Sequence, residues 1–138
     1  MKVKIDMWTR QTIDGDSDTM EHSAEGVLRE QLSEGQHLLT YFQDGVHNEM
    51  QINVADEEIT VVRNWKQENR FFYKQNQHHH MLYETPMGEM ELGFDTKYVE
   101  IDRLHPDSLL NIRLVYTITQ GGRPVSENEV RIRIREKK

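Results

Sequence analysis

Two histidines in this chain have a spacing that suits metal binding. His78 and His80 flank His79, so on an extended strand they share one face about 6.5–7 Å apart. At this spacing two imidazoles chelate a metal ion if a carboxylate from a neighbouring strand completes the set. A water-exposed strand start beside a loop is the simpler explanation, because Glu84, on the same face, lies too far along the same strand to complete the set easily. We therefore expect no metal site, and we keep a metal-assisted hydrolytic site at His78 and His80 as the alternative.

One arginine and two tyrosines continue the apolar faces of predicted strands. Arg63 is in phase with Ile59 and Val61, Tyr83 with Met81, and Tyr116 with Ile112 and Leu114. If these faces line a barrel, a guanidinium and two phenols point inward, where they would bind the carboxylate or phosphate of a small ligand. The alternative is structural: Arg63 pairs with an acidic neighbour, and the tyrosines fill the barrel.

Four acidic residues near the first predicted turn partly match a calcium-binding loop. Asp14, Asp16 and Asp18 occupy its first three ligand positions, and Glu25 occupies the twelfth. However, Thr19 stands where the loop needs glycine, and the flanking segments have strand patterns rather than helical ones. We interpret the segment as an acidic hairpin tip.

No motif for catalysis is present. The chain lacks a Gly-x-Ser-x-Gly elbow, a phosphate-binding glycine loop and a His-Glu-x-x-His sequence. The pair Gly121-Gly122 lies between two predicted strands and is a hairpin turn. We name no catalytic residue and no cofactor. The sequence favours a protein that is not an enzyme and leaves that question open.

The elements that position these side chains are strands. Residues 110–118 and 130–134 alternate apolar and polar side chains on both sides of a Gln-Gly-Gly-Arg-Pro turn, which predicts a β-hairpin. Weaker alternation and turn residues elsewhere predict further strands over 3–13, 22–31, 36–43, 46–54, 58–65, 70–74, 79–84 and 89–95, with a short strand over 97–102. Turns are predicted between them, including one at 33–36.

These predictions together define the fold class. The connections are short, so sequence neighbours pair, and eight to ten strands form an antiparallel up-and-down meander. A meander of this length can close into a β-barrel and remove both edges of the sheet. We expect one all-β barrel domain over residues 1–138.

Composition excludes several classes of protein. Cysteine is absent, which excludes disulfides, thiolate metal sites and a cysteine nucleophile. No signal peptide or membrane helix is recognisable, so we expect a cytoplasmic protein that does not bind membranes. The net charge is −7, which argues against nucleic-acid binding.

The charge is unevenly distributed. Residues 1–58 carry 4 basic and 13 acidic side chains, and residues 59–138 carry 13 basic and 11 acidic. The one basic cluster consists of Arg131, Arg133, Arg135, Lys137 and Lys138. Its arginines alternate with apolar residues, so they face away from the core. We interpret it as the solvated face of the last strand, which also protects an edge of the sheet. An anionic partner is the alternative.

The sequence resembles the YwiB-like proteins, which are small uncharacterised bacterial proteins. The resemblance covers nearly the whole chain and rests on Val62-Arg63, Phe71-Phe72-Tyr73, the Tyr83–Leu92 hairpin with its Tyr-x-Thr-Pro-x-Gly sequence, Thr96, Leu114-Val-Tyr116, Asn128 and Ile132-Arg-Ile134. It implies a lipocalin-like (calycin-type) β-barrel and a bacterial cytoplasmic setting. It implies no catalytic residue.

Two functional hypotheses follow. The first is a binding module whose barrel holds a small anionic or amphipathic ligand near Arg63, Tyr83 and Tyr116. The second is a filled barrel that acts in protein–protein interaction or as a homodimer, without a small ligand. An interior cavity below about 300 Å³ would count against the first hypothesis.

Overall fold

The computed structural model describes residues 1–30, 35–65 and 67–137. The predicted end of a strand at Gln31 and the first half of the predicted turn at 33–36 lie outside these residues. The strands are β1 (Lys2–Ile13), β2 (Asp16–Glu30), β3 (Gln36–Gln43), β4 (Val46–Asn53), β5 (Glu58–Trp65), β6 (Gln67–Lys74), β7 (His78–Thr85), β8 (Gly88–Asp102), β9 (Leu110–Gln120) and β10 (Arg123–Glu136). In this part of the chain, no helix has the length and apolar character needed to cross a membrane.

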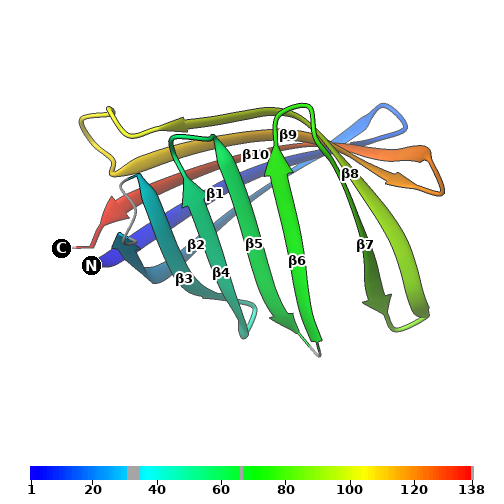
Figure 1. Cartoon of the computed structure of the whole chain (residues 1–138), viewed down its shortest axis with the longest axis horizontal. Helices are drawn as coiled ribbons and strands as arrows, with labels where there is room; N and C mark the ends of the chain where they lie inside the picture. Colours follow the sequence, from blue (N-terminus) through cyan, green and yellow to red (C-terminus); the bar gives the residue numbers. More distant parts are fainter. Residues whose placement is uncertain (31–34, 66, 138) are drawn as a thin grey trace.

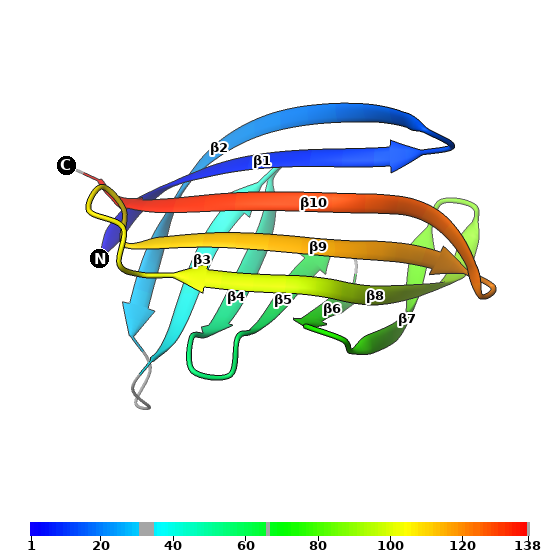
Figure 2. The same ribbon diagram turned by 90° about the horizontal axis from the view of Figure 1, so that it is seen from above.

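All ten strands belong to one antiparallel sheet with the order β6-β5-β4-β3-β2-β1-β10-β9-β8-β7. Strands that are consecutive in the chain pair with each other, except β6 and β7, and β1 also pairs with β10. The long strands β8, β9, β10, β1 and β2 form one wall, and β3–β7 curve across the other side (Figures 1 and 2). The predicted antiparallel up-and-down β-barrel is confirmed.

The core consists of the side chains at every second strand position. Ile5 pairs with Ile134, and Ile134 with Leu110, so that one apolar row crosses β1, β10 and β9. Complete burial of each such side chain contributes about 1.5–3 kcal/mol. The most deeply buried apolar side chains come from most of the strands: Val3, Ile5, Leu39, Ile52, Ile59, Val99, Leu110 and Ile134.

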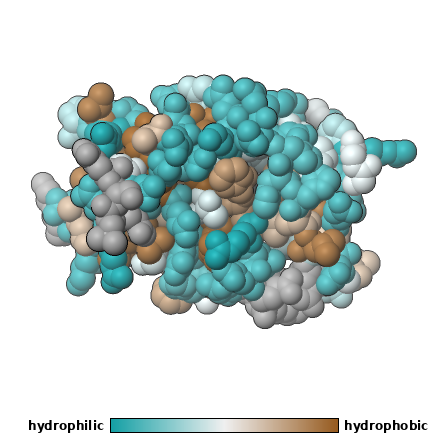
Figure 3. Space-filling view, in the orientation of Figure 1, coloured by the Kyte–Doolittle hydropathy of each residue, from teal (hydrophilic) through white to brown (hydrophobic). Residues whose placement is uncertain are grey.

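The barrel is not completely closed, because β6 and β7, the two ends of the sheet, face each other without a hydrogen-bonded ladder. Side chains join them instead. Phe71 of β6 lies 6.4 Å from the ring of Tyr83 and 5.7 Å from that of Phe94, and His79 Nε2 lies 3.0 Å from the carbonyl oxygen of Arg70. We expected the barrel to have no free sheet edge, but β6 and β7 keep theirs along this β6–β7 seam. Apolar surface is visible between hydrophilic side chains on this side of the molecule (Figure 3).

Several strands are longer than the sequence predicts, among them β8 and β2. The segments 89–95 and 97–102 form one strand, β8, with a register shift between Thr96 and Tyr98. This bulge adds one residue and breaks the alternation on which the prediction depended. β2 begins at Asp16 because the β1–β2 turn needs only Asp14 and Gly15, both with positive φ. The predicted acidic turn is therefore largely strand.

Candidate functional site

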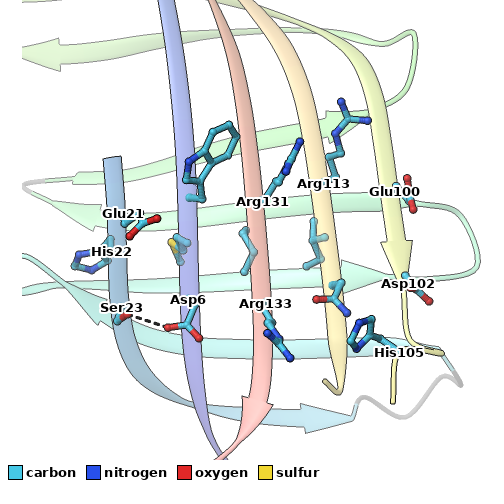
Figure 4. A pocket seen from close by; sticks show the side chains of 15 residues that line it. Asp6, Glu21, His22, Ser23, Glu100, Asp102, His105, Arg113, Arg131 and Arg133 are labelled. Carbon is cyan, nitrogen blue, oxygen red and sulfur yellow. Dashed lines mark hydrogen bonds between the residues drawn. The ribbon is translucent and has the colours of Figure 1, made fainter. Parts of the chain in front are cut away.

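A groove crosses the outer face of the wall formed by β2, β1, β10, β9 and β8 (Figure 4). The register aligns outward-facing side chains in two rows, Glu21-Trp8-Arg131-Arg113-Glu100 and Ser23-Asp6-Arg133-Asn111-Asp102. Outward positions along a strand are about 6.5–7 Å apart. Between the two rows, the side chains of Met7, Ile132 and Ile112 point into the core, so the backbone of β1, β10 and β9 forms the floor of the groove. The hollow has a volume of about 510 Å³.

Three arginines converge on one carboxylate beside the groove. Arg10 Nη2 donates to Glu129 Oε1 over 2.9 Å, while Arg113 Nε and Arg131 Nε donate to Oε2 over 3.1 and 2.8 Å. Glu129 is only 6% exposed, whereas the three arginine side chains are 43–58% exposed. One negative charge therefore offsets three positive charges, and the cluster keeps an excess of two positive charges near the surface.

Aromatic rings orient these guanidinium groups. The Trp8 ring lies 4.9 Å from Cζ of Arg131 and 5.8 Å from Cζ of Arg10, and the Tyr98 ring lies 5.2 Å from Cζ of Arg113. Such cation–π contacts attract a cation to the ring face. Together with the Glu129 carboxylate, they hold the arginines in place before any ligand arrives.

The second row adds further hydrogen-bond donors. Arg133 Nε donates to Ser108 Oγ over 2.9 Å. The buried Nδ2 of Asn111 has no hydrogen-bond partner among the described residues. Asp6 accepts hydrogen bonds from Ser23 and Arg135 over 2.9 and 2.8 Å. The middle of the groove therefore holds donors, and its accepting carboxylates lie mainly toward the ends (Figure 4).

The ion pairs stabilise the charged forms of two carboxyl groups. Partial burial works against ionisation of Glu129, but hydrogen bonds from Arg113 and Arg131 outweigh it and lower its pKa. The pKa of Asp6 is lowered in the same way, with desolvation opposed by Ser23 and Arg135. Both carboxylates are therefore charged at neutral pH.

A larger hollow of about 750 Å³ lies nearby but is a weaker candidate. It is lined by residues that include Lys4, Glu25, Arg135 and Lys137. Its charges are largely paired: Lys137 Nζ lies 2.8 Å from Glu25, and Arg135 lies 2.8 Å from Asp6. The groove is lined by four carboxylates, Asp6, Glu21, Glu100 and Asp102, but its three arginines lie together in the middle and make their described hydrogen bonds through Nε alone. The groove is the better site because their terminal nitrogens have no described partner.

The sequence predicted part of this site. Arg131, Arg133 and Arg135 face outward, as their alternation indicated. The interpretation that they protect an edge is wrong, because β10 lies between β1 and β9. Trp8 and Arg113 were missed, because only the pairing of β1 and β9 with β10 brings them beside Arg131.

The register places Arg63 on the inner face of the barrel. It pairs with Asn48 on one side and Asn69 on the other. Burial raises the pKa of nearby Tyr41 to about 12, and the positive charge of Arg63 opposes that rise. No carboxylate in the described part of the chain lies within ion-pair distance of Arg63. Its role in ligand binding stays a prediction.

Tyr83 and Tyr116 also belong to the inner face, and neither makes a described hydrogen bond or ring contact with Arg63. Tyr83 lies 6.4 Å from Phe71 at the β6–β7 seam. Tyr116 packs 4.9 Å from Tyr73 and is hydrogen-bonded to it, and burial raises the pKa of both phenols. Neither Arg63 nor Tyr83 lines the outer-face groove or the larger hollow beside it.

The tyrosine pair gives a direct stability prediction. The hydroxyl groups of Tyr73 and Tyr116 are hydrogen-bonded to each other. Tyr116→Phe should lower the free energy of unfolding by about 1–2 kcal/mol, because the buried hydroxyl of Tyr73 loses its partner. Tyr73→Phe removes the same hydrogen bond, so the double variant should lose less than the sum of the two single variants. Urea denaturation of the three variants measures this difference, and additive losses would contradict this arrangement.

The structure separates the residues of the possible calcium loop. Asp16 and Asp18 pair with Ile13 and Gln11 on β1, while Glu25 pairs with Lys4. Asp18 and Glu25 are therefore seven positions apart along β2, or about 23 Å. The acidic hairpin tip is the better interpretation. His78 and His80 lie on the outer face of β7, away from the groove.

Comparisons with known proteins agree with this fold. Residues 5–132 match a family model described as a domain of unknown function, DUF1934. The crystal structure of the ywiB protein from Bacillus subtilis is similar, with a TM-score of 0.78, 17% identity, and coverage of 99% of this chain and 92% of that one. No curated protein sequence matches the chain. The ten-stranded barrel and the nearly complete family match lead to one assignment: the chain belongs to the DUF1934 family of YwiB-like proteins.

Proposed function

We propose that this protein is a cytoplasmic binding module for a small anionic molecule, and that the outer-face groove is the binding site. The proposal rests on which nitrogens of three guanidinium groups are already hydrogen-bonded. Arg113, Arg131 and Arg133 all make their described hydrogen bonds through Nε. Their terminal nitrogens therefore remain available to a carboxylate or phosphate, which guanidinium groups bind through paired hydrogen bonds.

The positive charges in the middle of the groove favour an anion there. Arg131 and Arg113 pair directly across β10 and β9, a position in which like charges destabilise a sheet. Glu129 offsets only part of this repulsion. A bound anion would offset more of it, and the guanidinium groups would need little reordering, which lowers the entropic cost of binding.

Inside the barrel, Arg63 is a second candidate site for the acidic group of an amphipathic molecule. Arg63 faces inward without a described carboxylate partner, and the neighbouring Asn48 and Asn69 are 1% and 4% exposed. The β6–β7 seam would give access, and Tyr83 lies beside it. This site has weaker support, because Tyr73, Phe94 and Tyr116 pack against one another deeper inside.

Calorimetric titration of the full chain with pyrophosphate tests both sites. We expect saturable binding that weakens about tenfold in Arg131→Gln, which corresponds to about 1.4 kcal/mol. Arg123→Gln, an exposed change on the same strand, should leave the affinity unchanged. If Arg63→Gln weakens binding and Arg131→Gln does not, the barrel interior is the site.

Native mass spectrometry of the purified protein reports bound molecules and assembly mass together. A small anionic ligand that is present in the wild type and lost in Arg131→Gln would support the groove. If no tested anion binds and the mass corresponds to a dimer, the protein is better explained as a homodimeric interaction module. That result would contradict the proposed function.

A further inference from the structure

The outer face of β7 carries two imidazoles that nearly touch. The ring centroids of His78 and His80 are 4.2 Å apart, with an interplanar angle of 67°. The side chains are 45% and 57% exposed. His79 between them belongs to the inner face, and its Nε2 is occupied by the carbonyl oxygen of Arg70. The three consecutive histidines are therefore not equivalent.

Each of the two outer imidazoles has a carboxylate from β8 at the same ring nitrogen. Asp95 contacts Nδ1 of His78, and Glu91 lies 3.3 Å from Nδ1 of His80. A carboxylate on one ring nitrogen fixes the tautomer and leaves the other nitrogen with its lone pair. The same arrangement makes a metal-binding histidine a stronger ligand.

A glycine makes room for the His78 ring. Gly93 pairs with His80 on β8. A Cβ atom at this position would lie 2.9 Å from Cε1 and 3.3 Å from Nε2 of His78, and it would overlap Thr119 Oγ1. The imidazole of His78 therefore lies over Gly93, with Nε2 directed away from Asp95. Thr119 lies on the other side of Gly93, in the adjacent strand β9.

We propose that Nε2 of His78 and Nε2 of His80 together chelate an exchangeable divalent transition-metal ion on the outside of the barrel. Among the described residues, no group of three or more histidine, aspartate or glutamate side chains is placed to hold a metal ion. Water molecules would therefore complete the coordination shell. Imidazole ligands suit Cu²⁺, Ni²⁺ and Zn²⁺, and affinity should be highest for Cu²⁺. The site is independent of the groove on the opposite wall.

Titration of the chelator-stripped full chain with CuCl₂ tests this site. We expect one equivalent of Cu²⁺ to bind, with nitrogen hyperfine structure from two imidazoles in the electron paramagnetic resonance spectrum. His78→Gln and His80→Gln should each remove this equivalent, and their exposed positions should leave the melting temperature nearly unchanged. Asp95→Asn should weaken binding about 10–100-fold, because it removes the carboxylate behind the ligand.

Two matched variants distinguish this site from Cu²⁺ binding at other histidines of the chain. His79→Gln lies in the same run but on the inner face, and His47→Gln lies on β4. Both should keep the bound equivalent. Loss of binding in His79→Gln equal to that in His80→Gln, or no stoichiometric uptake by the wild type, would overturn the proposal.

Discussion

Replacing Glu129 with glutamine should lower the free energy of unfolding by about 2 kcal/mol at pH 7. The carboxylate accepts three hydrogen bonds from arginines, and hydrogen bonds to charged groups are each worth about 1.5–3 kcal/mol. The total is smaller than their sum because the arginines are largely solvated. Without the carboxylate, nothing offsets the repulsion between the positive charges of Arg113 and Arg131, which face each other across β9 and β10.

This loss should depend on pH. The pKa of Glu129 is lowered from its usual 4.5. The contribution of the carboxylate to the free energy of unfolding is therefore complete above about pH 4.5 and is lost as the pH falls through the lowered pKa. The stability difference between wild type and Glu129→Gln should therefore shrink in acid. Urea denaturation at pH 7 and pH 3 measures it, with Glu127→Gln as an exposed control on the same strand. A difference that is equal at both pH values would contradict the arginine pairing.

Replacing Gly26 with alanine should have an even larger effect on stability. A Cβ atom at Gly26 would overlap the carbonyl oxygen of Thr40 and lie 3.1 Å from Cβ of Tyr41 and 3.2 Å from Cδ1 of Ile5. Backbone on β3 would have to move, because a carbonyl oxygen cannot rotate away as a flexible side chain can. Overpacking of this kind costs about 1–3 kcal/mol and occasionally more, and we expect the upper end.

Thermal and urea unfolding of Gly26→Ala measure this cost. The matched control is Glu25→Ala, one residue away on the outer face, where an exposed ion pair with Lys137 contributes little. A Gly26→Ala variant as stable as the control would show that β2 and β3 are farther apart at this point than the register indicates.

The sequence predicted the strands well where alternation was strong. The β9–β10 hairpin and the inward face of Ile112 and Ile132 follow from side-chain parity alone. The bulge in β8 was not predictable in this way, because one inserted residue reverses the parity of everything that follows.

The groove was harder to predict, because its residues come from strands far apart in the chain. Arg10 and Glu129 are separated by 119 positions, and parity within a strand does not say which strands become neighbours. One signal was present: Asp6, Trp8 and Arg10 alternate with the core positions of the first strand as Arg131 and Arg133 do in the last. If β1 is paired with β10, these two sets meet.

The most direct test of the anion-binding groove is ¹⁵N NMR of the labelled full chain during titration with pyrophosphate. We predict that the indole N–H of Trp8 and the side-chain amide of Asn111 shift together along one saturable curve. Shifts confined to the side-chain amides of Asn48 and Asn69 inside the barrel, or no saturable shift at all, would contradict this account.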